Sequence, residues 1–155
     1  MRVTLCAVGR LRAGPELALT KDYLERFGKT GRALGLGPAR VVEVDAKGAG
    51  QSAEGTLLSR AIPDGAVICC LDERGKLLSS PDFAALLAGW RDQGRPDVAF
   101  VIGGADGIAP DLRDRADSAI SFGPMVWPHM LARVMLTEQL YRATQILAGT
   151  PYHRV

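Results

Sequence analysis

The sequence is poor in the residues that build metal centres and disulfide frameworks. Its 155 residues include only three cysteines and two histidines. Cys6 and the vicinal pair Cys69 and Cys70 lie inside apolar runs, and no C-x-x-C motif is combined with histidines at ligand spacing. This distribution predicts buried free thiols in a reducing compartment and argues against a structural zinc site. We therefore expect no metal.

Long hydrophobic runs are absent as well. No apolar run approaches the roughly 18–20 residues of a membrane span, and the chain opens with a strand pattern rather than a signal-peptide layout. Hydrophobic residues make up 47% and charged residues 23% of the chain, which is typical of a folded globular protein. We therefore expect one cytoplasmic domain over residues 1–155, with no membrane partner.

Four familiar motifs of enzymes are also missing. Gly28-Lys29-Thr30 looks like the end of a P-loop, but Tyr23 stands where its first glycine is required, and a helix pattern precedes it. No serine lies in a G-x-S-x-G elbow, and no carboxylate pair is placed for hydrolysis. Gly103, Gly104 and Gly107 lack the spacing of the dinucleotide fingerprint. These enzyme classes are therefore not indicated.

The chain does have a pair of glycine-rich loops, each after a buried-looking strand. Residues 98–102 run into Gly103-Gly104-Ala105-Asp106-Gly107, and residues 119–122 run into the turn 123–128. Loops with so little side chain bring bare backbone close to a ligand. The second loop adds an apolar floor for a flat heterocyclic cofactor, from Met125, Val126 and Trp127. Asp106 is either a ligand contact or a turn residue that bonds its own backbone.

Hydrophobic periodicity predicts strands and helices in alternation. The strands are expected at residues 2–8, 40–44, 66–71, 98–102 and 119–122. The helices are expected at residues 15–27, 53–61, 80–91 and 130–148, with a short one between the last two strands and Ser80 as the N-cap of the third. This order predicts an α/β fold on a single open, mainly parallel sheet with helices on both faces. Ligands bind beyond the C-terminal ends of such strands, where residues 72–76 are expected to form a third loop.

The last predicted helix is apolar on more than one side. Its apolar residues are Leu131, Val134, Met135, Leu136, Leu140, Tyr141, Ile146 and Leu147. One stripe covers the sheet, and a second favours contact with a partner subunit; burial in the middle of one domain is the alternative. The chain ends in Pro151-Tyr152-His153-Arg154, a tail rich enough in functional side chains to be expected against a site.

Charge is unevenly distributed along the chain. Residues 1–40 hold eight Lys and Arg against three acidic residues, whereas residues 64–117 hold ten acidic residues against six basic ones. The basic stretch is either a surface that faces phosphates or an ordinary solvated surface, and composition leaves both interpretations open.

These motifs resemble the small SPOUT-class (trefoil-knotted) RNA methyltransferases, and within them the single-domain bacterial family that methylates N3 of a pseudouridine in large-subunit ribosomal RNA. The matching segments are Ala7-Val8-Gly9, Leu71-Asp72 with Gly75-Lys76, residues 101–107, Pro128-His129 with Arg133, residues 138–143 and the closing Pro151-Tyr152-His153-Arg154. The resemblance spans the whole length, and the Tyr-His-Arg tail is its most specific part. Departures lie at residues 31–38, at Arg74 and in the turn 123–127.

The resemblance implies a C-terminal trefoil knot over about residues 98–155 and a pocket for S-adenosyl-L-methionine. The implied cofactor-binding residues are Leu71, Gly103, Gly104, Gly123, Pro124, Met125, Val126, Trp127 and Pro128. It further implies an active site completed across a homodimer, acting on 23S rRNA in the 50S subunit or 70S ribosome. A methyltransferase for tRNA or another uridine, and a non-enzymatic nucleotide-binding or ribosome-associated factor, are the alternatives.

The tail and the last helix supply the implied catalytic residues. Arg154 would orient the base or stabilise the charge that spreads onto its carbonyl oxygens when N3 loses its proton. His153 would accept that proton. Glu138 and Tyr152 would orient these two groups. Deleting residues 152–155 is therefore expected to abolish transfer while sparing cofactor binding.

Overall fold

A computed structural model describes residues 1–154 of the chain, and the elements alternate as the sequence predicts. The strands are β1 (Arg2–Val8), β2 (Ala39–Val44), β3 (Val67–Leu77), β4 (Asp97–Ile102) and β5 (Ser118–Ser121). The helices are α1 (Pro15–Gly31), the 3-10 turn η1 (Arg32–Leu34), α2 (Gln51–Ala61), α3 (Ser80–Asp92), α4 (Pro110–Arg115) and α5 (His129–Ala148). Within this part of the chain, no helix is long and apolar enough to cross a membrane.

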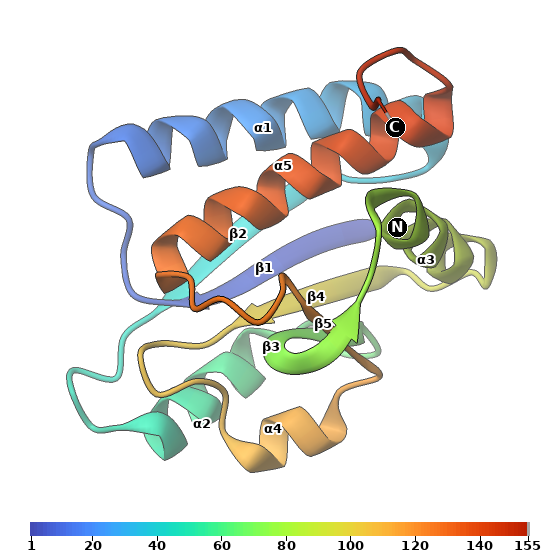
Figure 1. The fold of residues 1–155 in the computed structure, drawn as a ribbon. Helices are drawn as coiled ribbons and strands as arrows, with labels where there is room; N and C mark the ends of the chain where they lie inside the picture. The colour runs from blue at the N-terminus through green and yellow to red at the C-terminus, as the bar shows by residue number, and fades with distance from the viewer. Residues whose placement is uncertain (155) are drawn as a thin grey trace.

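The five strands form one parallel sheet in the order β2-β1-β4-β3-β5. Helices α1, α3 and α5 cover one face, and α2 and α4 cover the other (Figure 1). The predicted α/β class, with one parallel sheet and helices on both faces, is therefore confirmed. The trefoil knot implied for residues 98–155 stays a prediction.

Both faces of the central strands are buried, which explains their uninterrupted apolar sequence. Along β1, Val3 and Leu5 point into the core under α1, α3 and α5, while Cys6 points into the core over α2 and α4. This is the two-residue alternation of a strand. Every residue of β4 is buried. The sheet thus supplies a rigid platform, and its C-terminal strand ends form one edge.

The start of α3 differs from the prediction by one residue. Ser79, not Ser80, is the N-cap, because its Oγ accepts a hydrogen bond from the Asp82 backbone nitrogen at 3.1 Å. The Ser80 hydroxyl donates instead to Gln139 Oε1 on α5 at 2.7 Å. The two serines are adjacent, and only the position three residues before Asp82 can close the cap.

The stretch 72–76 was expected to be a loop, and this expectation is wrong. It lies inside β3, which continues to Leu77 and pairs with β5 on both sides of an irregularity. Leu71 and Lys76 are both register partners of Ile120. A Cβ on Gly75 would lie 2.6 Å from backbone atoms of Ala119 and Ile120. Its missing side chain therefore allows the two strands to approach, a long-range effect that a local pattern of polar residues and glycine does not reveal.

Helix α5 lies between α1 and α3 on its face of the sheet (Figure 1). Leu136, Leu140 and Ala143 belong to the core, and Tyr141 and Ile146 pack against it. The neighbouring helices therefore cover much of the second apolar stripe. The stripe by itself does not require a partner subunit, although Leu131 of α5 is exposed.

A buried arginine ties α5 to the ends of β1 and β2. Arg133 Nη1 lies 2.6 Å from Glu43 Oε2, and its Nη2 donates to the backbone carbonyls of Gly9 at 3.0 Å and Val8 at 3.3 Å. The same Glu43 oxygen accepts a hydrogen bond from the Leu11 backbone nitrogen at 2.7 Å. This network fixes the start of α5 beside the strand ends that border the candidate site.

Candidate functional site

A cavity of about 360 Å³ opens at the C-terminal edge of β3, β4 and β5, beside the first turn of α5. Its size falls within the range of about 300–1,000 Å³ that is typical of small-molecule sites. The predicted cofactor residues that line it are Leu71, Gly103, Gly104, Gly123, Met125, Val126 and Trp127. Pro124 and Pro128 belong to the same turn but do not line the cavity. The structure thus brings together a segment of β3 and the two glycine-rich loops, from distant parts of the sequence.

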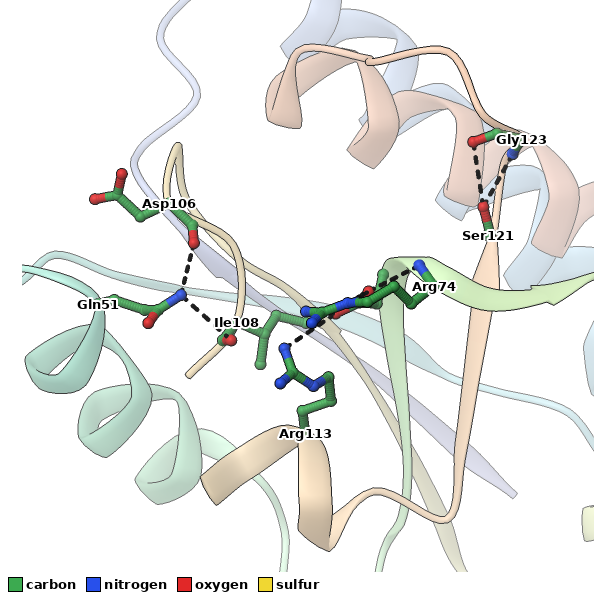
Figure 2. Close-up of polar contacts among 8 residues, drawn as sticks. Gln51, Arg74, Asp106, Ile108, Arg113, Ser121 and Gly123 are labelled. Carbon is green, nitrogen blue, oxygen red and sulfur yellow. Dashed lines mark hydrogen bonds and ion pairs between the residues drawn. The ribbon is translucent and has the colours of Figure 1, made fainter. Parts of the chain in front are cut away.

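The loop after β4 contributes backbone rather than side chain to the cavity. A Cβ on Gly103 would lie 2.6 Å from the Gly107 backbone, and the loop folds back so that Gly104 and Gly107 form a bridge. Gln51 Nε2 of α2 donates to the carbonyls of Asp106 at 2.6 Å and Ile108 at 3.4 Å, which holds the loop in place (Figure 2). A bulkier residue at Gly103 cannot fit this turn.

Asp106 is held through its backbone, not through its carboxylate. In Figure 2 its carboxylate points away from Gln51, and among the described residues it accepts no hydrogen bond. The interpretation as a turn residue that bonds its own backbone finds no support. The Asp106 carboxylate is exposed, on a loop that borders the cavity.

A charged group that sequence reasoning missed lies in the cavity wall. The Asp72 side chain is 6% exposed, and its carboxylate accepts hydrogen bonds from Arg74 Nε at 3.0 Å and Arg74 Nη2 at 3.2 Å. Arg113 Nη1 of α4 lies 3.8 Å from the same carboxylate. Burial raises the pKa of Asp72, but the hydrogen bonds and charge of Arg74, with the charge of Arg113, outweigh it and hold the pKa below its usual value. Asp72 is therefore an ionised, neutralised group.

The apolar residues of the turn 123–128 form a rim rather than the expected floor. Val126 is 89% exposed and Met125 73%, while Trp127 is held at 40% by a hydrogen bond from its Nε1 to the Phe122 carbonyl at 3.4 Å. The buried lining comes instead from Ile102 and Ile120, with half-buried Leu71. Large exposed apolar side chains beside a cavity are typical of a surface that another molecule covers.

A second polar cluster lies halfway along α5, where the C-terminal tail folds back. Glu138 Oε1 accepts hydrogen bonds from Arg142 Nη2 at 2.7 Å, Arg142 Nε at 3.0 Å and the Tyr152 hydroxyl at 2.9 Å. Arg142 also lies over the Tyr152 ring, 4.8 Å from its centroid, and its Nη1 is 3.2 Å from His153 Nδ1. Burial and the Glu138 carboxylate raise the pKa of Tyr152 to about 12, so its hydroxyl remains a donor.

Three of the four predicted catalytic residues therefore meet. Glu138, Tyr152 and His153 form one cluster, whereas Arg154 is exposed at the end of the described chain. Arg142 was missed as a site residue. Its position four residues after Glu138, the spacing at which helix side chains meet, was the available signal.

The cluster does not reach the cavity of its own chain. Ala132 is the last residue of α5 that lines the cavity, and Glu138 follows six residues later, about 9 Å further along the helix axis. Within one chain, the tail and the cavity are therefore separate. No three His, Cys, Asp or Glu residues between Met1 and Arg154 are arranged to hold a metal ion.

Comparison with known proteins identifies the family. The family model described as "Predicted SPOUT methyltransferase" matches residues 1–153. The chain belongs to the SPOUT methyltransferase family. Among its relatives is a Ruegeria pomeroyi protein named ribosomal RNA large subunit methyltransferase H, 72% identical over 156 residues that cover 100% of both chains. A Paracoccus denitrificans protein of the same name is 68% identical over 155 residues, with 99% of each chain covered.

Two solved structures share the fold of this SPOUT chain. A probable methylase family protein from Haemophilus influenzae Rd KW20 has a TM-score of 0.55 at 10% identity, covering 99% of this chain and 70% of that one. A probable methyltransferase from Bordetella pertussis Tohama I has a TM-score of 0.52 at 13% identity, covering 92% and 96%. At such low identity these matches concern the fold alone.

Proposed function

We propose that this SPOUT protein transfers a methyl group from S-adenosyl-L-methionine to N3 of a pseudouridine in 23S ribosomal RNA. The observation that carries the proposal is the backbone-lined cavity at the ends of β3, β4 and β5, in a chain 72% identical over its full length to a ribosomal RNA large subunit methyltransferase H. A cytoplasmic location follows from such a substrate.

The cavity fits the methyl donor in shape and chemistry. Gly103 and Gly104 expose backbone where a side chain would fill the space, while Leu71, Ile102 and Ile120 offer an apolar surface to a flat base. When bound, the donor supplies an activated methyl group on a positively charged sulfur. Since Arg74 and Arg113 neutralise Asp72, the acidic groups left at the cavity to face that charge include Glu73 and Asp106.

We infer that a second copy of the chain completes the site. The Glu138 cluster lies about 9 Å along α5 from the cavity of its own chain, so its tail is better placed to serve another subunit. Exposed Met125, Val126 and Leu131, beside the cavity, supply apolar surface for such a contact. In this arrangement Arg154, which is exposed, reaches the target base.

Basic residues at the same edge of the sheet support an RNA substrate. Arg10 and Arg12 follow β1, Lys47 follows β2, and all three are exposed. Because parallel strands end at one edge, these charges lie on the side of the molecule that carries the cavity. Such contacts bind phosphates without reading sequence. We therefore propose that an assembled 50S subunit or 70S ribosome, rather than short naked RNA, is the substrate.

The test combines labelled methyl transfer with mapping of the product. Purified protein is incubated with tritiated S-adenosyl-L-methionine and either 70S ribosomes, 50S subunits or short 23S fragments from a deletion strain. We expect label in 70S or 50S particles and a methylated pseudouridine by mass spectrometry of the rRNA. Equal labelling of short fragments contradicts the proposal that the assembled particle is the substrate. A methylated tRNA or a methylated uridine in place of pseudouridine assigns a different substrate. Cofactor binding by calorimetry without any transfer identifies a non-enzymatic binding protein.

A further inference from the structure

The contact between Arg142 and His153 constrains the protonation of the imidazole ring. Arg142 Nη1 lies 3.2 Å from His153 Nδ1. A guanidinium has five N–H donors and no acceptor, so it can only donate in this contact. Nδ1 must therefore offer its lone pair, and the ring proton of a neutral imidazole then resides on Nε2.

Arg142 is firmly placed to make this contact. Its Nε and Nη2 both donate to Glu138 Oε1, at 3.0 Å and 2.7 Å, and its guanidinium lies over the Tyr152 ring. The hydrogen bond to Glu138 raises the pKa of Arg142, so it stays cationic. With these groups engaged, Nη1 is the nitrogen left to meet the imidazole of His153.

In this contact neither nitrogen of the neutral ring has a free lone pair. Nδ1 already uses its lone pair, and Nε2 already carries a hydrogen. A proton added at Nδ1 would break the contact and place a second positive charge beside Arg142. The charged and titratable groups of this cluster are Arg142 and Glu138 on α5 and Tyr152 in the tail, and further out Tyr23 and Arg26 of α1 stack near Tyr141.

We propose that Arg142 is a positioning residue that fixes His153 as an Nε2–H hydrogen-bond donor, and that His153 does not accept the N3 proton. This rests on the function proposed above and changes the role expected for His153. The methyl group bonds to N3 as its bond to sulfur breaks, and the proton of N3 passes to solvent water. The donor Nε2–H then stabilises the negative charge that spreads onto a carbonyl oxygen beside N3.

The tautomer is measured directly by nitrogen NMR of protein labelled at histidine. The chain has only two histidines, so the ring signals that disappear in His153→Gln belong to His153. We expect the Nε2–H pattern in the wild-type protein. Arg142→Met keeps most of the apolar stem of the side chain but removes every donor, and we expect it to raise the population of the Nδ1–H tautomer with the fold intact by circular dichroism. An Nδ1–H tautomer in the wild type, or no change in Arg142→Met, overturns the proposal.

Methyl-transfer activity of His153 variants then distinguishes a hydrogen-bond donor from a general base at this position. A glutamine amide can donate as Nε2–H does but cannot take the N3 proton, so we expect His153→Gln to keep kcat within about tenfold of the wild type, whereas His153→Ala loses about 100-fold. If His153→Gln falls as far as His153→Ala, the donor role is refuted. The NMR result does not depend on turnover, so a wild-type protein without methyl transfer overturns the proposed function and still reports the tautomer.

Discussion

Replacing Arg133 by methionine is the sharpest test of the packing described above. The substitution keeps most of the apolar stem of a side chain that is 1% exposed, and removes its charge and all its donors. The carbonyls of Val8 and Gly9 and the Glu43 carboxylate lose their shared partner. The strand ends beside the cavity thereby lose their polar link to α5.

The loss of stability depends on which former partners of Arg133 can regain hydrogen bonds or solvation. Removing one partner of a buried ion pair costs about 3–5 kcal/mol. Glu43 is 32% exposed and keeps its bond from the Leu11 nitrogen, so water restores part of its solvation. Arg133 Nε has no hydrogen-bond partner among the described residues, so its loss costs nothing. We therefore expect a loss of about 3 kcal/mol in the free energy of unfolding, the lower end of that range.

Urea unfolding, followed by circular dichroism and tryptophan fluorescence, measures this loss. Arg115→Met, an exposed arginine at the end of α4, is the matched control and should change stability by about 0.5 kcal/mol or less. Glu43→Gln combined with Arg133→Met should cost less than the sum of the two single changes, because the residues are coupled. An Arg133→Met protein within about 1 kcal/mol of the wild type, against the 3–5 kcal/mol of a broken buried pair, would refute the reasoning.

Three further predictions follow from the structure. Gly75→Ala should lower the free energy of unfolding by about 1–3 kcal/mol, since its Cβ meets the β5 backbone, whereas Gly89→Ala in open space on α3 should be neutral or stabilising in the same urea titration. The pKa of Asp72 is lowered in the folded protein, so its ionised carboxylate stabilises the fold at pH values above its pKa in the unfolded chain, and this stabilisation is lost as pH falls through its pKa in the folded protein. Asp72→Asn should therefore flatten the acid dependence of the free energy of unfolding, and an unchanged dependence on pH contradicts this prediction. Deletion of residues 152–155 should abolish methyl transfer while leaving cofactor affinity in calorimetry unchanged, and near-normal transfer by the truncated protein rules out a catalytic tail.

Local signals in the sequence predicted much of the fold. The apolar run 98–102 followed by Gly103 and Gly104 marks a buried strand and its loop without reference to any other part of the chain. The extension of β3 to Leu77 was not predictable in this way, because it depends on pairing with Ile120 of β5. The same limit applies to the ion pair of Arg113 with Asp72, whose partners meet only once the sheet has formed.

The candidate site, too, was predictable from local sequence signals only in part. The glycine loops and the tail were recognisable from their residues, and the structure brings the loops to one cavity and part of the tail to one cluster. Their separation along α5 depends on how the tail folds back, which no local pattern encodes. The role proposed for His153 differs from the expected one for a similar reason, since the proposal depends on the contact with the neighbouring Arg142 and not on the imidazole alone.

The double pairing of Ile120 with Leu71 and Lys76 limits how the family can vary in length. Residues 72–75, between these two partners, already have no register partner on β5, and the backbone of Ala119 and Ile120 leaves no space beside Gly75 for an inserted residue. The turn between β2 and α2 carries no such restraint, and its exposed residues 47–49 can be lengthened freely. Insertions among relatives should therefore gather after β2 and be absent from residues 72–75, a pattern that an alignment of the family can check.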